Sequence, residues 1–182
     1  MIKPYAGRTH DKMKDVLMDP SASGPEIHYY MIRGGSNKRN ITVWEPGTIG
    51  GEYIKAYGHY HVGDLEEDYT ILEGEGIIIL QSPVVDMSVT SFKAVFVKAG
   101  DTIHIPKNTG HLAINTGKTW LVTSDNSPVN FEDKDPVGLP GHADYESVRV
   151  MKGFAYYVVD VDGKPSFVKN TTYVNVPEVE VV

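Results

Sequence analysis

Two histidines separated by a single residue, His59 and His61, constrain this chain most strongly. Side chains of a β-strand repeat every two residues, so both imidazoles would lie on one side of an extended segment. Each neutral ring can offer one nitrogen to a cation. Glu67 follows at the start of the next apolar run, and His111 follows a second β-rich segment over residues 100–106. Three histidines and one glutamate from two such segments can form a compact metal site.

Short apolar runs separated by turn residues predict a fold rich in β-strands. The chain of 182 residues contains 18 Gly and 11 Pro, which suits many tight turns and few long helices. The runs recur about every eight to twelve residues, as in an all-β barrel or sandwich. Because both halves carry histidines, we expect an all-β double-sheet jelly roll that forms a single domain over residues 1–182.

The pattern also predicts where the elements lie. Thr9 is expected to cap a short N-terminal helix that ends at about Leu17. The turn Glu73–Gly76 is expected to close a hairpin, and residues 126–141 to form a surface loop that could serve as a lid or rim. The end of the chain reads as a tail or an edge strand. Strands are expected at 26–33, 40–45, 52–60, 68–72, 77–81, 84–89, 92–97, 102–105, 111–115, 119–123, 147–151, 154–161 and 166–168.

Composition restricts the partners. The formal net charge of −7 argues against binding to nucleic acid or to an anionic membrane, which requires a basic surface. The chain has no cysteine, so disulfides and thiolate metal ligands are excluded. We see no leader and no apolar run of membrane-spanning length, and we expect a cytoplasmic protein. Apolar strands near both ends have edges to cover, which favours a homodimer.

The two histidine segments together resemble the two motifs of the cupin superfamily. The resemblance implies a cupin double-stranded β-helix, which is a jelly-roll barrel, but it does not specify a chemistry because cupins host many functions. The first motif is Gly58-His59-Tyr60-His61 with Glu67 and Gly74, and the second is Gly100-x5-Pro106-x4-His111-x3-Asn115.

Further residues make the chain similar to the cupin-type phosphoglucose isomerases. The resemblance implies interconversion of glucose 6-phosphate and fructose 6-phosphate, an aldose–ketose isomerisation of glycolysis and gluconeogenesis. It also implies one divalent transition metal per chain (Fe, Mn, Ni or Zn), bound by His59, His61, Glu67 and His111. The residues that carry the similarity are Thr42-Val43-x-x-Pro46-Gly47, Glu67-x-Tyr69 and Gly141-His142-x-Asp144-Tyr145.

The same resemblance implies roles at a sugar-phosphate pocket. Positions matching Thr42 and Gly58 lie at the sugar-phosphate site of the family, and positions matching Tyr69, His142 and Tyr145 line its pocket. An early aromatic position of the family stays open here among His28, Tyr29 and Tyr30. The extra Ala143 within the last motif leaves the exact sugar phosphate open. The residues expected to take part in catalysis are Glu67, Tyr69 and His142.

The chemistry leaves further alternatives. Glu67 is a candidate general base in an enediol route or a plain metal ligand in a direct hydride shift. Phosphate donors could include Lys55 or Lys107 if they point inward. We interpret His10, His28 and His104 as structural. A cupin dioxygenase with Fe(II) and a non-enzymatic sugar-binding cupin are competing functions, which metal analysis and an assay on sugar phosphates would distinguish.

Overall fold

The computed structural model describes residues 5–32, 39–127 and 143–182. Strands dominate this part of the chain. The helical segments are α1 (His10–Met13), a 3-10 turn η1 (Lys14–Val16) and α2 (Glu146–Val150). The strands are β1 (Tyr5–Thr9), β2 (Ile27–Ile32), β3 (Asn40–Trp44), β4 (Thr48–Ile49), β5 (Glu52–Tyr53), β6 (Tyr60–His61), β7 (Glu67–Glu73), β8 (Glu75–Gln81), β9 (Phe92–Lys98), β10 (Thr102–Ile105), β11 (Gly110–Asn115), β12 (Leu121–Asp125), β13 (Ala143–Asp144), β14 (Tyr156–Val161), β15 (Lys164–Lys169) and β16 (Glu180–Val181).

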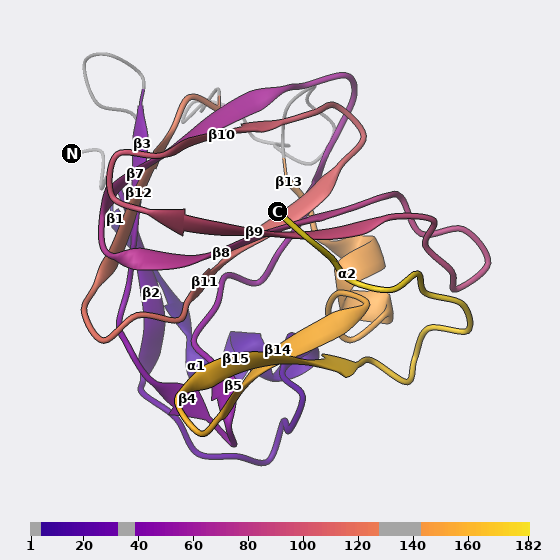
Figure 1. Cartoon of the computed structure of the whole chain (residues 1–182), viewed down its shortest axis with the longest axis horizontal. Helices are drawn as coiled ribbons and strands as arrows, with labels where there is room; N and C mark the ends of the chain where they lie inside the picture. Colours follow the sequence, from indigo (N-terminus) through magenta and orange to yellow (C-terminus); the bar gives the residue numbers. More distant parts are fainter. Residues whose placement is uncertain (1–4, 33–38, 128–142) are drawn as a thin grey trace.

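Four sheets build the fold. A six-stranded sheet has the order β1-β2-β3-β12-β7-β10, and a four-stranded sheet has the order β11-β8-β9-β16. A second four-stranded sheet has the order β15-β14-β5-β4, and β13 pairs with β6 in a two-stranded sheet. In Figure 1 the six-stranded sheet runs up the left side and across the top, where β10 lies. Strands β8, β9 and β11 cross the middle, and β14 and β15 lie below them. The prediction of an all-β cupin jelly roll with a short N-terminal helix is confirmed.

The core lies between these sheets. Trp44 and Ile71 come from the six-stranded sheet, and the three consecutive isoleucines Ile77, Ile78 and Ile79 come from β8. All three isoleucines are fully buried, so both faces of β8 are covered.

The N-terminal helix forms as the sequence predicts. The side chain of Thr9 caps α1 by accepting a hydrogen bond from the backbone N–H of Lys12. Met13 and Val16 are fully buried on its inner side, and η1 forms the last turn before Leu17. Neither α-helix in the described part of the chain is long and apolar enough to cross a membrane.

A strand was expected over 147–151, but residues 147–150 lie in α2 and Met151 is the C-cap of that helix. Val148 and Met151 are buried three positions apart, as on one side of a helix, and Glu146 forms an ion pair with Arg149 at 2.7 Å across the same spacing. A short apolar run does not distinguish a helix from a strand, which explains the error.

The expected hairpin at Glu73–Gly76 is also wrong. Strand β7 pairs with β10 and β12, whereas β8 pairs with β9 and β11, so the turn carries the chain from the six-stranded sheet to the four-stranded sheet that contains β8. Gly74 has a φ of +82°, and a Cβ there would lie 2.3 Å from the carbonyl oxygen of Trp120. Only glycine fits this crossing of two strands.

Three other expectations change in detail. The strand expected over 52–60 is interrupted. The segment that joins β5 to β6 makes two single bridges to β11, Lys55–Ile114 and His59–His111. Residues 84–89 contain a tight turn with positive φ at Asp86 and Met87 rather than a strand. The C-terminal end forms the edge strand β16, parallel to β9. Of the expected loop 126–141, residues 128–141 lie outside the described part of the chain.

Candidate metal centre

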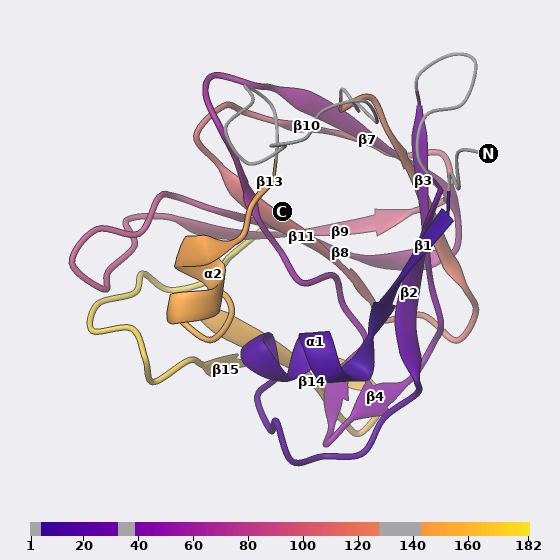
Figure 2. The same ribbon diagram turned by 180° about the vertical axis from the view of Figure 1, so that it is seen from behind.

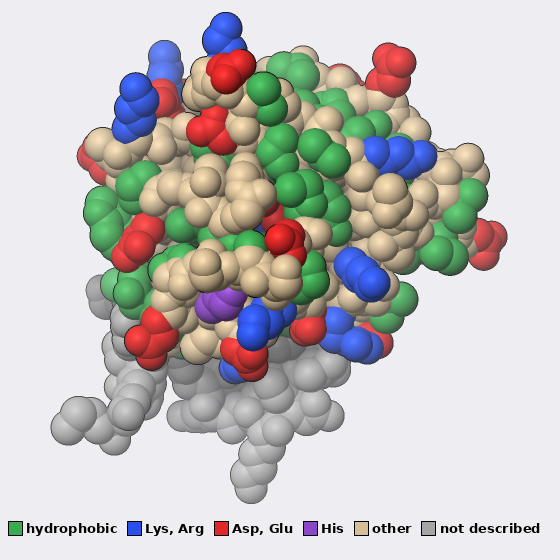
Figure 3. All heavy atoms as spheres, turned by 90° about the horizontal axis from the view of Figure 1, so that it is seen from below, with side chains coloured by type: hydrophobic (Ala, Val, Ile, Leu, Met, Phe, Trp, Pro, Cys, Tyr) green, Lys and Arg blue, Asp and Glu red, His purple; other side chains and the backbone are tan. Residues whose placement is uncertain are grey.

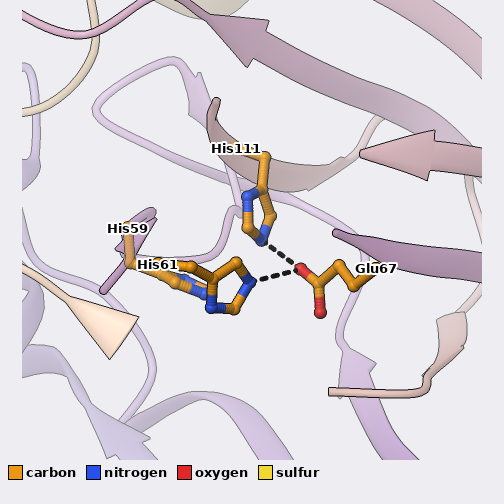
Figure 4. Close-up of side chains that lie close together, drawn as sticks. All are labelled: His59, His61, Glu67 and His111. Carbon is orange, nitrogen blue, oxygen red and sulfur yellow. Dashed lines mark hydrogen bonds and ion pairs between the residues drawn. The ribbon is translucent and has the colours of Figure 1, made fainter. Parts of the chain in front are cut away.

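Four side chains expected to bind a metal lie together inside the barrel. One ligand atom from each of His59, His61, Glu67 and His111 lies within 4.8 Å of every other. Figure 4 shows His59 and His61 on one side, Glu67 opposite them and His111 above. They come from the segment before β6, from β6 itself, from the first residue of β7 and from β11.

Backbone pairing fixes these positions. His59 and His111 exchange two backbone hydrogen bonds, of 3.2 Å and 3.0 Å, which places their rings 4.4 Å apart. The rings of His59 and His61 lie 4.8 Å apart, as the spacing of two residues along one face predicts. The cluster therefore depends on a pairing between β11 and the segment before β6, which the local sequence does not encode.

Glu67 is the centre of the cluster. Its Oε1 lies 3.0 Å from His61 Nε2 and 2.6 Å from His111 Nε2. Its Oε2 accepts a hydrogen bond of 2.5 Å from Ser127 Oγ. Burial alone would raise the pKa of Glu67, but the ring nitrogens of His111 and His61 hold that pKa well below its usual range. The carboxylate is therefore ionised at neutral pH.

The surroundings of His111 show that the cluster fits a cation. Its Nδ1 lies 3.3 Å from the carbonyl oxygen of Thr109, which can only accept a hydrogen bond, so Nδ1 carries the proton. Nε2 then faces Glu67 Oε1. Nε2 is buried and makes no hydrogen bond of acceptable geometry within the described ranges. A cation between Nε2 and the ionised carboxylate would be stabilised by both, so the cluster could hold a metal ion.

Two tyrosines flank the cluster. Tyr69 follows Glu67 by two residues on β7, and its ring lies 5.4 Å from that of His111 in an edge-to-face arrangement. Tyr145, at the start of α2, has its ring 5.6 Å from that of His59 and 5.4 Å from that of Tyr57. His142 lies outside the described residues, so its expected role has no structural account here.

The residues expected at the sugar-phosphate site lie on the inner wall. Thr42 on β3 is buried and sits opposite Thr123 of β12, whose hydroxyl is buried without a partner in the described ranges. Gly58 has a φ of +82°, and a Cβ there would lie 3.1 Å from Phe154. Of the three early aromatic residues, the hydroxyl of Tyr29 lies 3.2 Å from the backbone nitrogen of Tyr57, next to Gly58.

Neither lysine considered as a phosphate donor points into the site. Lys55 is buried, donates a hydrogen bond of 2.7 Å to the carbonyl oxygen of Val16 and forms an ion pair with Glu52. Lys107 is more than half exposed and lies 4.0 Å from Asp64.

The histidines interpreted as structural lie away from the cluster. His104 is exposed on β10 and pairs with Asp68 at 2.9 Å. His10 and His28 contact each other at 2.8 Å, an arrangement that the sequence pattern did not reveal.

Sequence reasoning missed several residues near the cluster. Ser127 contacts Glu67, but no motif signals it because the contact joins positions sixty residues apart. Arg8 stacks against Tyr145, and it was missed because residues 1–8 show no clear pattern. Thr123 was assigned to a strand without a role. Only the paired strands bring these three side chains to the inner wall.

The jelly roll and the cluster of three histidines and one glutamate define a cupin barrel with a candidate metal centre. The glucose-6-phosphate isomerase (GPI) family model matches residues 21–175, which is most of the chain. The chain belongs to this family.

The chain is also similar to two relatives and, more distantly, to two solved structures. The glucose-6-phosphate isomerase of Thermococcus gammatolerans is 31% identical over 139 residues, covering 76% of this chain and 65% of the relative. The glucose-6-phosphate isomerase of Pyrococcus furiosus is 30% identical over 130 residues, covering 71% of this chain and 60% of the relative. The chain thus spans less than two thirds of the length of these relatives. A solved structure of CapF from Staphylococcus aureus is distantly similar, with a TM-score of 0.47 and 17% identity, covering 63% of this chain and 30% of that one. The Drosophila melanogaster CENP-C cupin domain has a TM-score of 0.43 and 11% identity, covering 58% of this chain and 74% of that one.

Proposed function

We propose that this chain is a metal-dependent aldose–ketose isomerase that interconverts glucose 6-phosphate and fructose 6-phosphate. One observation carries the proposal: the buried Nε2 of His111 faces the ionised Glu67 at 2.6 Å in a chain of the glucose-6-phosphate isomerase family. This arrangement supports a cation site in the interior of the barrel. We propose His59, His61, Glu67 and His111 as the ligands of one divalent metal per chain. Nitrogen and oxygen donors without thiolate suit Mn, Fe, Ni or Zn.

A divalent cation bound there would polarise the sugar carbonyl and favour the charge that develops on its oxygen. Glu67 would then stand next to C1 and C2 of the sugar. In the enediol route its carboxylate takes the C2 proton of the aldose and returns it at C1, while the hydroxyl proton of O2 is transferred to O1, so the ketose forms without net gain or loss of hydrogen. In the alternative route hydrogen moves directly from C2 to C1, and Glu67 serves only as a ligand.

The surrounding residues would bind and orient the sugar phosphate. Tyr69 and Tyr145 flank the cluster, and we assign their hydroxyls to sugar oxygens. Thr42 and the backbone at Gly58 would contact the phosphate end. We also keep His142 as a proposed catalytic and substrate-binding residue on the strength of the family resemblance. A single domain over residues 1–182 and a cytoplasmic location stay predictions.

We further propose a homodimer. Exposed apolar side chains occur near both ends of the chain, with Ile32 at 43% and Val181 at 59% exposure. Figure 3 shows hydrophobic side chains grouped on one face of the molecule. Such edges and patches favour association with a second copy. A monomer mass in solution at micromolar concentration would contradict this proposal.

The function is tested with purified protein loaded with Mn²⁺, Fe²⁺, Ni²⁺ or Zn²⁺ and assayed in both directions with a coupled assay. We expect reversible isomerisation that EDTA abolishes and added metal restores. Lack of activity on either hexose phosphate in the metal-loaded protein would reject the substrate. Oxygen consumption restricted to the Fe²⁺ form would favour a dioxygenase. Sugar binding that survives removal of the metal, without turnover, would favour a sugar-binding cupin.

A further inference from the structure

Arg8 lies in a cage of three tyrosine rings beside the candidate metal centre. Its guanidinium carbon is 5.9 Å from the ring centroid of Tyr29, 5.3 Å from that of Tyr57 and 5.2 Å from that of Tyr145. Arg8 Nε also donates a hydrogen bond of 3.1 Å to the hydroxyl of Tyr29. On its other side, the ring of Tyr145 lies 5.6 Å from that of His59. A single tyrosine therefore lies between the guanidinium and a proposed metal ligand.

Strand register directs Arg8 towards the interior. Arg8 on β1 lies opposite Tyr29 on β2, and Tyr29 lies opposite Trp44 on β3. Residues opposite each other in neighbouring strands project to the same face of a sheet. Tyr29 and Trp44 are both buried in the core, so this is the inner face. Figure 2 shows β1 beside β2 at the edge of the sheet, leading directly into α1.

The charge of Arg8 lacks a carboxylate partner within the described ranges. Burial opposes the charge, but Tyr29 and Tyr145 raise the pKa of Arg8 above its usual value. Asp15, at the edge of the cage, accepts a hydrogen bond of 3.2 Å from the hydroxyl of Tyr57. A half-buried guanidinium without an anion leaves N–H donors available, since its hydrogen bonds to Tyr29 and Tyr145 use only two of five. Such an arrangement suits an anionic ligand.

We propose that Arg8 binds the phosphate group of the sugar-phosphate substrate, which places the phosphate at the tyrosine cage and the reacting carbons at Glu67. The inference rests on the function proposed above and adds a phosphate-binding residue to it. A planar guanidinium donates two parallel hydrogen bonds to phosphate oxygens. The hydroxyl of Tyr29 lies next to it and can add a donor. Lys55 is already paired with Glu52, so Arg8 supplies the positive charge that the phosphate requires in a chain of net charge −7.

The test compares Arg8→Gln and Arg8→Lys with the wild type. A matched control is Arg149→Gln, which removes the same charge from the exposed surface of α2, where Arg149 pairs with Glu146. We expect the KM for fructose 6-phosphate and the inhibition constant of inorganic phosphate to rise about ten- to a hundredfold in Arg8→Gln, the scale of a charge-assisted hydrogen bond. The kcat should change little because the lost contact is made equally in ground and transition states. In Arg8→Lys both constants should lie between those of the wild type and those of Arg8→Gln. In Arg149→Gln both should equal the wild-type values.

The outcomes separate this inference from the function on which it rests. An unchanged KM and unchanged phosphate inhibition in active Arg8→Gln protein would overturn the role of Arg8 and leave the isomerase intact. If the wild type isomerises neither hexose phosphate, calorimetric titration with inorganic phosphate decides about Arg8 alone. Phosphate binding that is lost in Arg8→Gln supports the site, and equal binding or no binding to the wild type overturns it. If Arg8→Gln melts early, Arg8→Lys is used, and wild-type phosphate affinity in that variant overturns the proposal.

Discussion

His111 Nε2 lies 2.6 Å from Oε1 of Glu67, while Nδ1 of the same ring faces the carbonyl oxygen of Thr109 at 3.3 Å. The carbonyl orients the ring, so that Nε2 faces the carboxylate. Ser127 holds the other carboxylate oxygen at 2.5 Å and sets its direction. Both partners of the close pair are thus oriented by neighbours that would not themselves touch a metal, the usual support of a metal site.

The first prediction concerns metal occupancy. His111→Ala removes the ring that faces Glu67, so bound metal should drop from about one ion per chain to near zero. Inductively coupled plasma mass spectrometry on dialysed protein measures the change. His104→Ala is the matched control because His104 is exposed and pairs with Asp68 on the outer side. Full occupancy in His111→Ala would show that the ligand assignment is wrong.

The second prediction concerns the base. Glu67→Gln keeps the size and one oxygen ligand but removes the basic carboxylate. If Glu67 transfers the proton, this variant should retain much of its metal and lose about 10²–10⁴-fold in kcat, the usual scale for loss of a general base. Steady-state kinetics on metal-assayed protein checks both quantities. Near-wild-type turnover with metal retained would leave Glu67 as a ligand only and favour the hydride shift.

The sequence predicts the fold class and the grouping of the four expected ligands because their spacing restricts them. His59 and His61 repeat at the period of a strand, so their rings lie together wherever that segment is extended. The resemblance to cupins then places His111 opposite them. The features that the sequence did not predict depend on pairing between strands that are distant in the chain. Arg8 enters the site only because β1 pairs with β2, and nothing in residues 1–8 specifies that strand.

Ambiguous local patterns explain the other errors. Gly74 suits a hairpin as well as a crossing between sheets, since both require positive φ. Val148 and Met151 fit a short strand as well as one turn of a helix. In both cases the choice depends on which distant strand or core surface the segment contacts.

The third prediction concerns Gly74. Gly74→Ala combines a positive φ with a Cβ that would lie 2.3 Å from the carbonyl oxygen of Trp120. We expect the free energy of unfolding to fall by about 2–4 kcal/mol, from backbone strain together with overpacking. Gly163→Ala is the control, because its φ is +77° but a Cβ there meets nothing within 4 Å, and it should lose only about 1 kcal/mol. Equal losses in urea unfolding would contradict the role of the close contact.

The last prediction concerns His28, which is buried and contacts the half-buried His10. Burial, together with the nearby His10 and Lys55, lowers the pKa of His28 to about 4 from its usual value of 6.5. Between these values the unfolded chain binds a proton that the folded chain does not, so protonation favours unfolding. The contribution of His28 is fully present above pH 6.5 and is lost as the pH falls towards 4. Its size is at most about 3 kcal/mol.

Urea unfolding between pH 7 and pH 4.5 tests this prediction, with EDTA present throughout because metal affinity also depends on pH. Other charges face this pair: Lys55 lies near His28 and is itself paired with Glu52. The comparison is therefore between the wild type and His28→Gln, which retains the other charges. We expect the stability of the wild type to fall more steeply with acidification than that of His28→Gln. Parallel slopes would show that His28 does not couple folding to pH.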